Sequence, residues 1–128
     1  MRLISDFALA VICIWQEARS EPNEGKVAVG EVIRNRMKKK GQNVAQVVLA
    51  PLQFSGMNAH DVNRVPSFQI EDTDPVVVAC ANAWLVSATS NLTNGALNYF
   101  NPKTSDPMWA AELQNPVQIG SHLFGIVP

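Results

Sequence analysis

The sequence has little net charge and no long hydrophobic run. Its 128 residues carry a formal charge of -1, so the protein as a whole would attract neither nucleic acid nor an anionic membrane. The apolar run from Phe7 to Trp15 is too short to cross a bilayer, and its flanks, Asp6 and Gln16-Glu17, suit a signal peptide poorly. We therefore expect no nucleic-acid partner and no stable membrane insertion, and we assign the run to the core.

Histidine and cysteine are also scarce, with two of each. Two histidines and two cysteines in these positions do not make a zinc site, so no metal is expected. Cys13 and Cys80 lie in apolar helical contexts, where free buried thiols are more common than a bridge between helices, although a bridge stays open. The chain has no glycine-rich phosphate loop and no nucleophile-elbow serine. No cofactor is expected, and acidic side chains remain as the catalytic material.

The residues that are present predict one mainly α (α+β) domain covering residues 1–128. Apolar residues make up 47% of the chain, enough for a real core. Periodicity and capping residues predict helices over 7–17, 22–40, 44–49 and 75–88, with Ser20 and Asn43 as caps and Gly41 as a stop. The last of these is apolar nearly all round, which predicts packing on several sides. Short elements follow: an extended piece at 96–100, a helix at 108–113 and a C-terminal β-hairpin over 117–124.

The only basic cluster lies near the end of the second predicted helix. It contains Arg34, Arg36 and Lys38–Lys40. No aromatic residues are interleaved with it, so we expect these cations to face water and to stabilise the helix C-terminus. A protein that binds its partner through this patch is kept as an alternative from a different class.

Glu17 is the strongest catalytic candidate. It is predicted at the C-terminal end of the first helix, where the helix dipole and apolar neighbours would both favour the neutral acid. A proton donor that works near neutrality needs such a raised pKa. From these residues alone, an ordinary ion pair or a solvent-facing glutamate remains the more common outcome.

Four short sequence motifs follow one another along the chain and together span nearly all of it. The first is Glu17-Ala18-Arg19-Ser20-Glu21-Pro22, followed by Gly25, Ala28-Val29, Val32 and Asn35-Arg36. The later ones are Gln53-Phe54-Ser55, then Asn98-Tyr99 with Pro107-Met108-Trp109, and finally Ile119-Gly120-Ser121-His122-Leu123-Phe124. This series resembles the SleB-like cell-wall hydrolases, known from spore-cortex-lytic enzymes and phage endolysins. Three positions depart from the family pattern: Ser20, Gly56 and Asn98.

The resemblance implies a lysozyme-like, mostly helical fold and a peptidoglycan glycan strand as substrate, cut between N-acetylmuramic acid and N-acetylglucosamine. Glu17 would be the catalytic acid and base. We expect Gln53, Ser55, Tyr99 and Asn101 to orient the sugar N-acetyl groups and the oxocarbenium-like centre. The expected protein is a monomer that acts on the cell wall, in the periplasm or outside the cell. The lack of a convincing signal peptide suits a small phage endolysin released from the host cytoplasm.

The choice between hydrolysis and lytic transglycosylation depends on a second carboxylate. A hydrolase (muramidase) normally needs one, as nucleophile at about 5 Å or as base for water at about 6.5–9.5 Å. Glu21 is available, but Pro22 and the expected helix break make it better suited to satisfying backbone amides or Arg19. A transglycosylase needs Glu17 alone, because the 6-hydroxyl of the muramic acid attacks its own anomeric carbon. We favour the transglycosylase; the hydrolase and a non-catalytic glycan-binding domain remain as alternatives.

Overall fold

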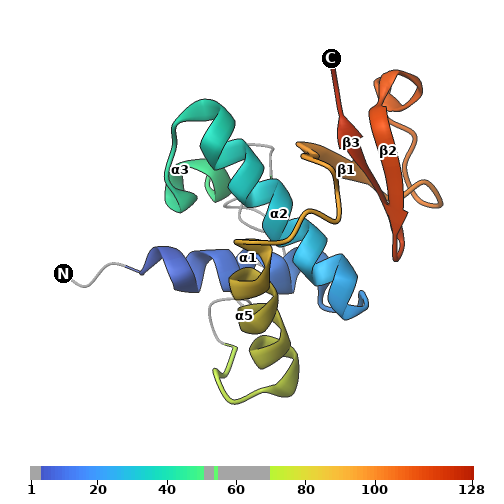
Figure 1. The fold of residues 1–128 in the computed structure, drawn as a ribbon. Helices are drawn as coiled ribbons and strands as arrows, with labels where there is room; N and C mark the ends of the chain where they lie inside the picture. The colour runs from blue at the N-terminus through green and yellow to red at the C-terminus, as the bar shows by residue number, and fades with distance from the viewer. Residues whose placement is uncertain (1–3, 51–53, 55–69) are drawn as a thin grey trace.

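The structure is a computed structural model that describes residues 4–50, 54 and 70–128. Its longer elements are helices α1 (Asp6–Ala18), α2 (Asn23–Lys40), α3 (Val44–Val48) and α5 (Pro75–Ser87), and strands β1 (Asn98–Phe100), β2 (Gln114–Ile119) and β3 (His122–Ile126). In Figure 1, α1 and α5 meet at α2, and the three strands stand together beyond the opposite side of α2. The mainly helical architecture with a small C-terminal sheet confirms the predicted class.

Helix α1 forms the centre of the helical layer. Ser5 caps it, since its hydroxyl accepts a hydrogen bond from the amide of Ala8 at 3.1 Å. The helix packs against α2, α3 and α5, and its buried residues are Leu9, Ala10, Val11, Ile12, Cys13, Ile14 and Ala18. Burial on so many sides holds the last turn of α1 in place, and Glu17 lies in that turn.

Helices α2 and α3 begin and end close to the predicted residues. Gly41 ends α2 in a left-handed conformation, φ 62°, and its amide donates to the carbonyl of Met37, as the stop predicted there requires. Asn43 caps α3 in a reciprocal capping box with Gln46. The prediction of Ser20 as the cap of α2 is wrong. Pro22 occupies the cap position and makes no side-chain hydrogen bond there.

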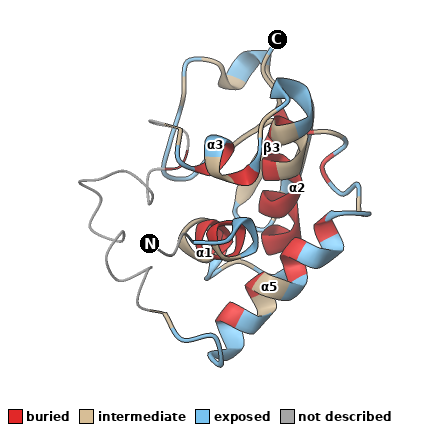
Figure 2. Ribbon diagram, turned by 90° about the vertical axis from the view of Figure 1, so that its left-hand side faces the viewer, coloured by how far each residue is buried: buried red, intermediate tan, exposed pale blue. Residues whose placement is uncertain are grey.

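Helix α5 starts as predicted, with the Asp74 side chain accepting from the amide of Val76 at 2.8 Å. The prediction that it packs on several sides is wrong. One face, which includes Cys80 and Trp84, is buried against α1 and α2, while Leu85 and Val86 on the other face are 59% and 51% exposed. Figure 2 shows this alternation of buried and exposed segments along the helix. Apolar content all round a helix therefore did not mean burial all round.

The sheet has the order β1-β3-β2, with both pairs antiparallel. The predicted hairpin is β2 and β3, and the predicted extended piece pairs with it as a third strand, placing Tyr99 opposite Phe124. The short helix predicted at 108–113 is the 3₁₀ turn Ala110–Glu112. Phe54 and Phe124 are both completely buried in the core, and Cys13 and Cys80 are buried free thiols.

Three side chains of α2 tie the helix to the segment that leads into β1. Asn35 donates to the carbonyl of Ala96 at 3.0 Å and Arg36 to that of Leu97 at 2.7 Å. One turn earlier, the carboxylate of Glu31 binds residues 90–93. Because β1 continues directly from this anchored segment, α2 determines where Tyr99 lies.

Candidate active site

Glu17 and Tyr99 meet although 82 residues separate them in the sequence. The Tyr99 hydroxyl donates to Oε1 of Glu17 at 2.5 Å. Glu17 is half-buried in the last turn of α1, and Tyr99 lies at the middle of β1. Two residues predicted separately for the site are thus brought into direct contact.

The electrostatics of this pair make the phenol the donor. Burial, followed by the negative charge of Glu17, raises the pKa of Tyr99 well above its ordinary value of 10.0. The phenol therefore keeps its proton and Glu17 can accept the hydrogen bond as a carboxylate. A hydrogen bond to the charged form of a carboxyl group favours that form, so Tyr99 stabilises the state that Glu17 reaches after giving up a proton.

Two aromatic rings hold the Tyr99 ring from the neighbouring strand β3. His122 meets it edge to face at 5.0 Å between ring centroids, and Phe124 lies tilted at 5.2 Å. Burial lowers the pKa of His122, and the charge of Glu21 partly opposes that shift. The imidazole is therefore mostly neutral near pH 7 and serves as a packing partner of Tyr99.

Glu21 is engaged with the tip of the β2–β3 hairpin. Its Oε1 accepts from the amide of Ser121 at 2.7 Å and lies 3.5 Å from Nδ1 of His122, and its side chain is only 8% exposed. Gly120 is required beside it, because its φ is +57° and a Cβ there would lie 2.4 Å from the same carboxylate oxygen. Glu21 accepts from a backbone amide, as predicted, but the prediction that it lies in the first turn of the second helix is wrong: it precedes α2, and the amide belongs to the distant hairpin.

The other predicted site residues are not brought to this pair by the described structure. Gln53 and Ser55 lie outside the described residues. The side chain of Asn101 accepts from the amide of Lys103 at 2.9 Å, and its carbonyl accepts from Thr104 and Ser105. Asn101 thus builds its own turn directly after β1, and its contact with a sugar remains a prediction.

The prediction that the basic cluster faces water is wrong for its two arginines. Arg36 is 8% exposed, and Arg34 is half-buried, with its guanidinium 3.6 Å from the Trp84 ring centroid and its Nε on the Ser87 hydroxyl at 2.8 Å. Lys38–Lys40 are exposed as expected. A signal for Arg36 was present in the sequence, since it follows Val32 and Ile33 at helical spacing on the buried stripe of α2.

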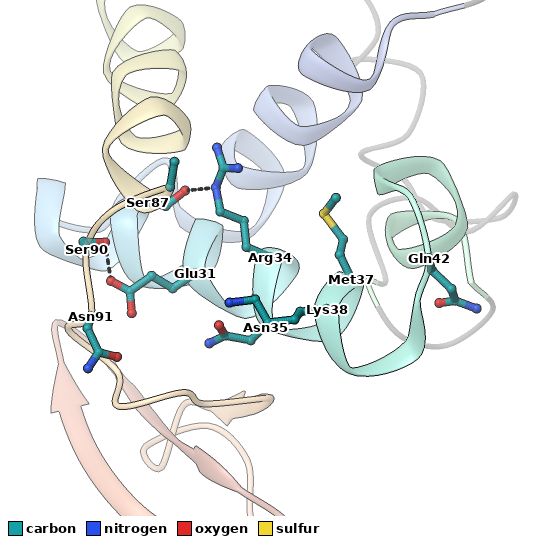
Figure 3. Close-up of a pocket in the computed structure, with 10 residues that line it drawn as sticks. Glu31, Arg34, Asn35, Met37, Lys38, Gln42, Ser87, Ser90 and Asn91 are labelled. Carbon is teal, nitrogen blue, oxygen red and sulfur yellow. Dashed lines mark hydrogen bonds between the residues drawn. The ribbon is translucent and has the colours of Figure 1, made fainter.

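A polar cavity of about 450 Å³ lies elsewhere, between α2 and the end of α5. Figure 3 shows Glu31 and Ser90 at one side of it, with Arg34 above and Asn35 and Lys38 below. Neither Glu17 nor Tyr99 lines this cavity. Among the described residues, no group of three or more acidic, histidine or cysteine side chains is arranged to hold a metal, and none of the helices is both long and apolar enough to span a bilayer.

Comparison with known proteins shows the family of the chain. The family model described as cell wall hydrolase matches residues 20–125. The spore cortex-lytic enzyme of Bacillus subtilis (strain 168) is 31% identical over 122 residues, covering 94% of this chain and 37% of that enzyme. Its counterpart in Oceanobacillus iheyensis is 30% identical, with 94% and 41% covered. The chain thus spans less than half the length of these curated relatives.

Solved structures show the same fold. The catalytic domain of the Bacillus cereus SleB protein superposes with a TM-score of 0.73 at 27% identity, covering 94% of this chain and 88% of that one. The catalytic domain of the germination-specific lytic transglycosylase SleB from Bacillus anthracis gives 0.72 at 29%, with 94% and 93% covered. The fold is therefore the lysozyme-like helical one, as predicted. The chain belongs to the cell wall hydrolase family, which confirms the resemblance drawn from the four motifs.

Proposed function

We propose that this protein cleaves peptidoglycan glycan strands as a lytic transglycosylase, with Glu17 as its catalytic acid and base. The observation that carries the proposal is the contact of Glu17 with the Tyr99 hydroxyl at the end of a buried helix. The similarity to spore cortex-lytic enzymes supports a cell-wall substrate. The similarity to the Bacillus anthracis protein, which is named a germination-specific lytic transglycosylase, supports the reaction type.

In the first step, Glu17 donates its proton to the oxygen that links N-acetylmuramic acid to N-acetylglucosamine. The bond breaks and the leaving sugar departs as an alcohol, while positive charge develops at C1 of the muramic acid. In the second step, the Glu17 carboxylate takes the proton of the 6-hydroxyl on the same sugar, whose oxygen bonds to C1. The product is a 1,6-anhydro ring, and Glu17 is again protonated.

The surroundings of Glu21 favour this one-carboxylate reaction over the hydrolase alternative. A second catalytic carboxylate must reach the sugar or a water beside it. Glu21 is instead nearly buried, accepts from Ser121 and has Gly120 packed against the same oxygen. It stabilises the hairpin that carries His122 to Tyr99.

The basic-patch alternative is weakened by the placement of the arginines. That alternative needs a solvent-facing basic surface, yet Arg34 and Arg36 turn into the protein. Only Lys38–Lys40 remain exposed from the cluster. A wall-directed endolysin that acts as a monomer stays our prediction for the biological setting.

The decisive experiment is digestion of purified peptidoglycan in water enriched in heavy oxygen, followed by mass spectrometry of the soluble products. A transglycosylase leaves 1,6-anhydro ends, one water lighter than reducing ends and without the heavy label. Glu17→Gln serves as the inactive control. Reducing muramic acid ends that carry the label would establish the hydrolase instead, and binding without cleavage by the folded wild type would establish the glycan-binding alternative.

A further inference from the structure

Arg36 is a buried cation without a carboxylate in direct contact in the described structure. It is 8% exposed, and no salt bridge within 4.0 Å joins Arg36 to a carboxylate of the described residues. Its Nε donates to the carbonyl of Leu97, and its guanidinium lies 4.9 Å from the centroid of the Phe54 ring. Burying a charge is costly unless the surroundings compensate, so this arginine calls for an explanation.

One nitrogen of the Arg36 guanidinium also lacks a hydrogen-bond partner in the described part of the chain. Nη1 of Arg36 is buried and has no hydrogen-bond partner among the residues that the structure describes. Such unsatisfied buried groups are rare in native proteins, and each one calls for an explanation. The cation is therefore not explained by local hydrogen bonding alone.

The groups that feel this charge belong to the candidate active site. The titratable side chains that interact electrostatically with Arg36 are Glu17 and Cys13 from α1 and Tyr99 from β1. Burial lowers the pKa of Arg36, and the ionised forms of Tyr99, Cys13 and Glu17, in that order, oppose that shift. Interaction between two charges is reciprocal, so the same proximity must stabilise the Glu17 carboxylate.

We propose that Arg36 is a positioning residue of the proposed reaction: its buried guanidinium holds the β1 segment at Leu97 and stabilises the Glu17 carboxylate left after proton donation. This inference rests on the proposed function for its catalytic meaning. Leu97 lies two residues before Tyr99. The hydrogen bond from Arg36 to the Leu97 carbonyl therefore also fixes the position of the Tyr99 hydroxyl relative to Glu17. One side chain of α2 thus acts on both members of the pair.

The expected effect on Glu17 has a definite sign. Three of the groups that interact with Glu17 are Tyr99 from β1, Cys13 from its own helix and Arg36 from α2. Of these three, only Arg36 brings a positive charge, which favours the ionised carboxyl group. Removing that charge must therefore raise the pKa of Glu17, by about one unit or more if the guanidinium acts at the usual range of such pairs.

The test compares Arg36→Met, Arg36→Lys and Arg34→Met with the wild type in the 128-residue chain. Methionine removes the charge but keeps much of the volume, and such replacements of buried ions are often tolerated. Lysine keeps the charge and loses the planar fork. Arg34 is the matched control, because it lies on the same helix and is tied to Ser87 and Trp84, away from Glu17. Arg36→Gln is the second neutral variant should Arg36→Met fail to fold.

The pKa of Glu17 is measured directly by carbon NMR of protein labelled at glutamate carboxyl groups, with Glu17→Gln identifying the resonance. We expect the neutral Arg36 variants to raise it by about one unit, and Arg36→Lys and Arg34→Met to leave it near the wild-type value. An unchanged pKa in the folded neutral variants overturns the proposal. An equal rise in Arg36→Lys or Arg34→Met also overturns it, since general loosening would then be the cause.

A kinetic measurement tests whether the charge of Arg36 affects the reaction through the pKa of Glu17. Since Glu17 must be protonated to start, kcat/KM falls as pH rises through its pKa. The alkaline limb of the pH profile of kcat/KM should therefore shift to higher pH in the neutral variants, by the same number of pH units as the pKa measured by NMR. A protein without peptidoglycan activity would refute the proposed function and leave the NMR result standing, whereas an active enzyme whose limb does not move would refute the role of Arg36.

Discussion

Glu17 and Glu31 are two glutamates that turn into the protein, and their surroundings differ in kind. Glu31 is 3% exposed and accepts four hydrogen bonds, from the hydroxyls of Ser90 and Thr93 and the amides of Leu92 and Thr93, at 2.5 to 2.9 Å. All its donors belong to the loop that follows α5. Both carboxylate oxygens are thereby occupied, which makes Glu31 a structural tether.

Glu17 instead lies half-buried at a helix end, beside a phenol whose raised pKa keeps it a donor. Tyr99 can support the carboxylate without occupying every acceptor position, since a carboxylate has about four of them. The comparison teaches that burial of an acidic group does not by itself indicate catalysis. What distinguishes the two sites is whether the donors come from a structural loop or from another candidate catalytic side chain.

The largest expected effect is that of Glu17→Gln. The amide keeps the shape of the side chain but can neither give nor recover a proton, so peptidoglycan cleavage should fall by at least about 10³-fold. Thermal unfolding should stay close to that of the wild type. Rates of muropeptide release from folded protein provide the measurement, and wild-type turnover would remove Glu17 from the mechanism.

The matching change on the other side of the comparison is Glu31→Gln. An amide nitrogen would face donors where an oxygen is needed, and the free energy of unfolding should fall by about 2–4 kcal/mol. Denaturant unfolding measures this loss, while kcat/KM of the folded protein should remain near wild type. A variant that unfolds normally but loses activity would show that Glu31 is more than a tether.

Tyr99→Phe removes the donor to Glu17 and keeps the ring between its aromatic neighbours. Hydrogen bonds to charged groups contribute about 1.5–3 kcal/mol, so kcat should fall by about 10- to 100-fold with little change in KM. Phe100→Leu, a change at the next strand position, is the control for disturbance of the sheet. Equal losses in both variants would mean that the sheet, and not the phenol, is responsible.

A smaller effect is expected for Glu21→Gln. Weakening the bond to Ser121 and the contact with His122 should lower the free energy of unfolding by about 1 kcal/mol and leave measurable activity. Glu24→Gln, an exposed change of the same charge nearby, controls for the loss of charge. Complete inactivation of folded Glu21→Gln would instead favour a hydrolase with two carboxylates.

The smallest effect concerns alkaline pH. The folded-state pKa of Tyr99 is raised above its ordinary value of 10.0, so its contribution to stability is complete below that pH and is lost as pH rises towards the folded-state pKa. Stability should therefore decline above about pH 10 in the wild type. Tyr99→Phe should decline less steeply, and the residual slope belongs partly to Cys13 and Cys80, whose thiol pKa values are also raised by burial. Parallel slopes in the two proteins would contradict this.

Local chemistry explains why much of the helical framework followed from the sequence. Asn43 and Asp74 cap helices by bonding to amides two or three residues away, and Gly41 ends α2 through its own backbone conformation. Each signal acts within a single turn, so no knowledge of the rest of the fold is needed. For the same reason the sequence alone places Glu17 at the end of the first helix.

Only the tertiary structure determined which residues Glu17 and Glu21 contact. Hydrogen bonds that span 82 and 100 positions join Tyr99 to Glu17 and Ser121 to Glu21. They depend on strand register and on how the sheet packs against α2, which sequence periodicity does not encode. The same holds for burial: Arg36 turned into the protein because Leu97 and Phe54 meet it there, and one apolar face of α5 stayed exposed because no described element covers it.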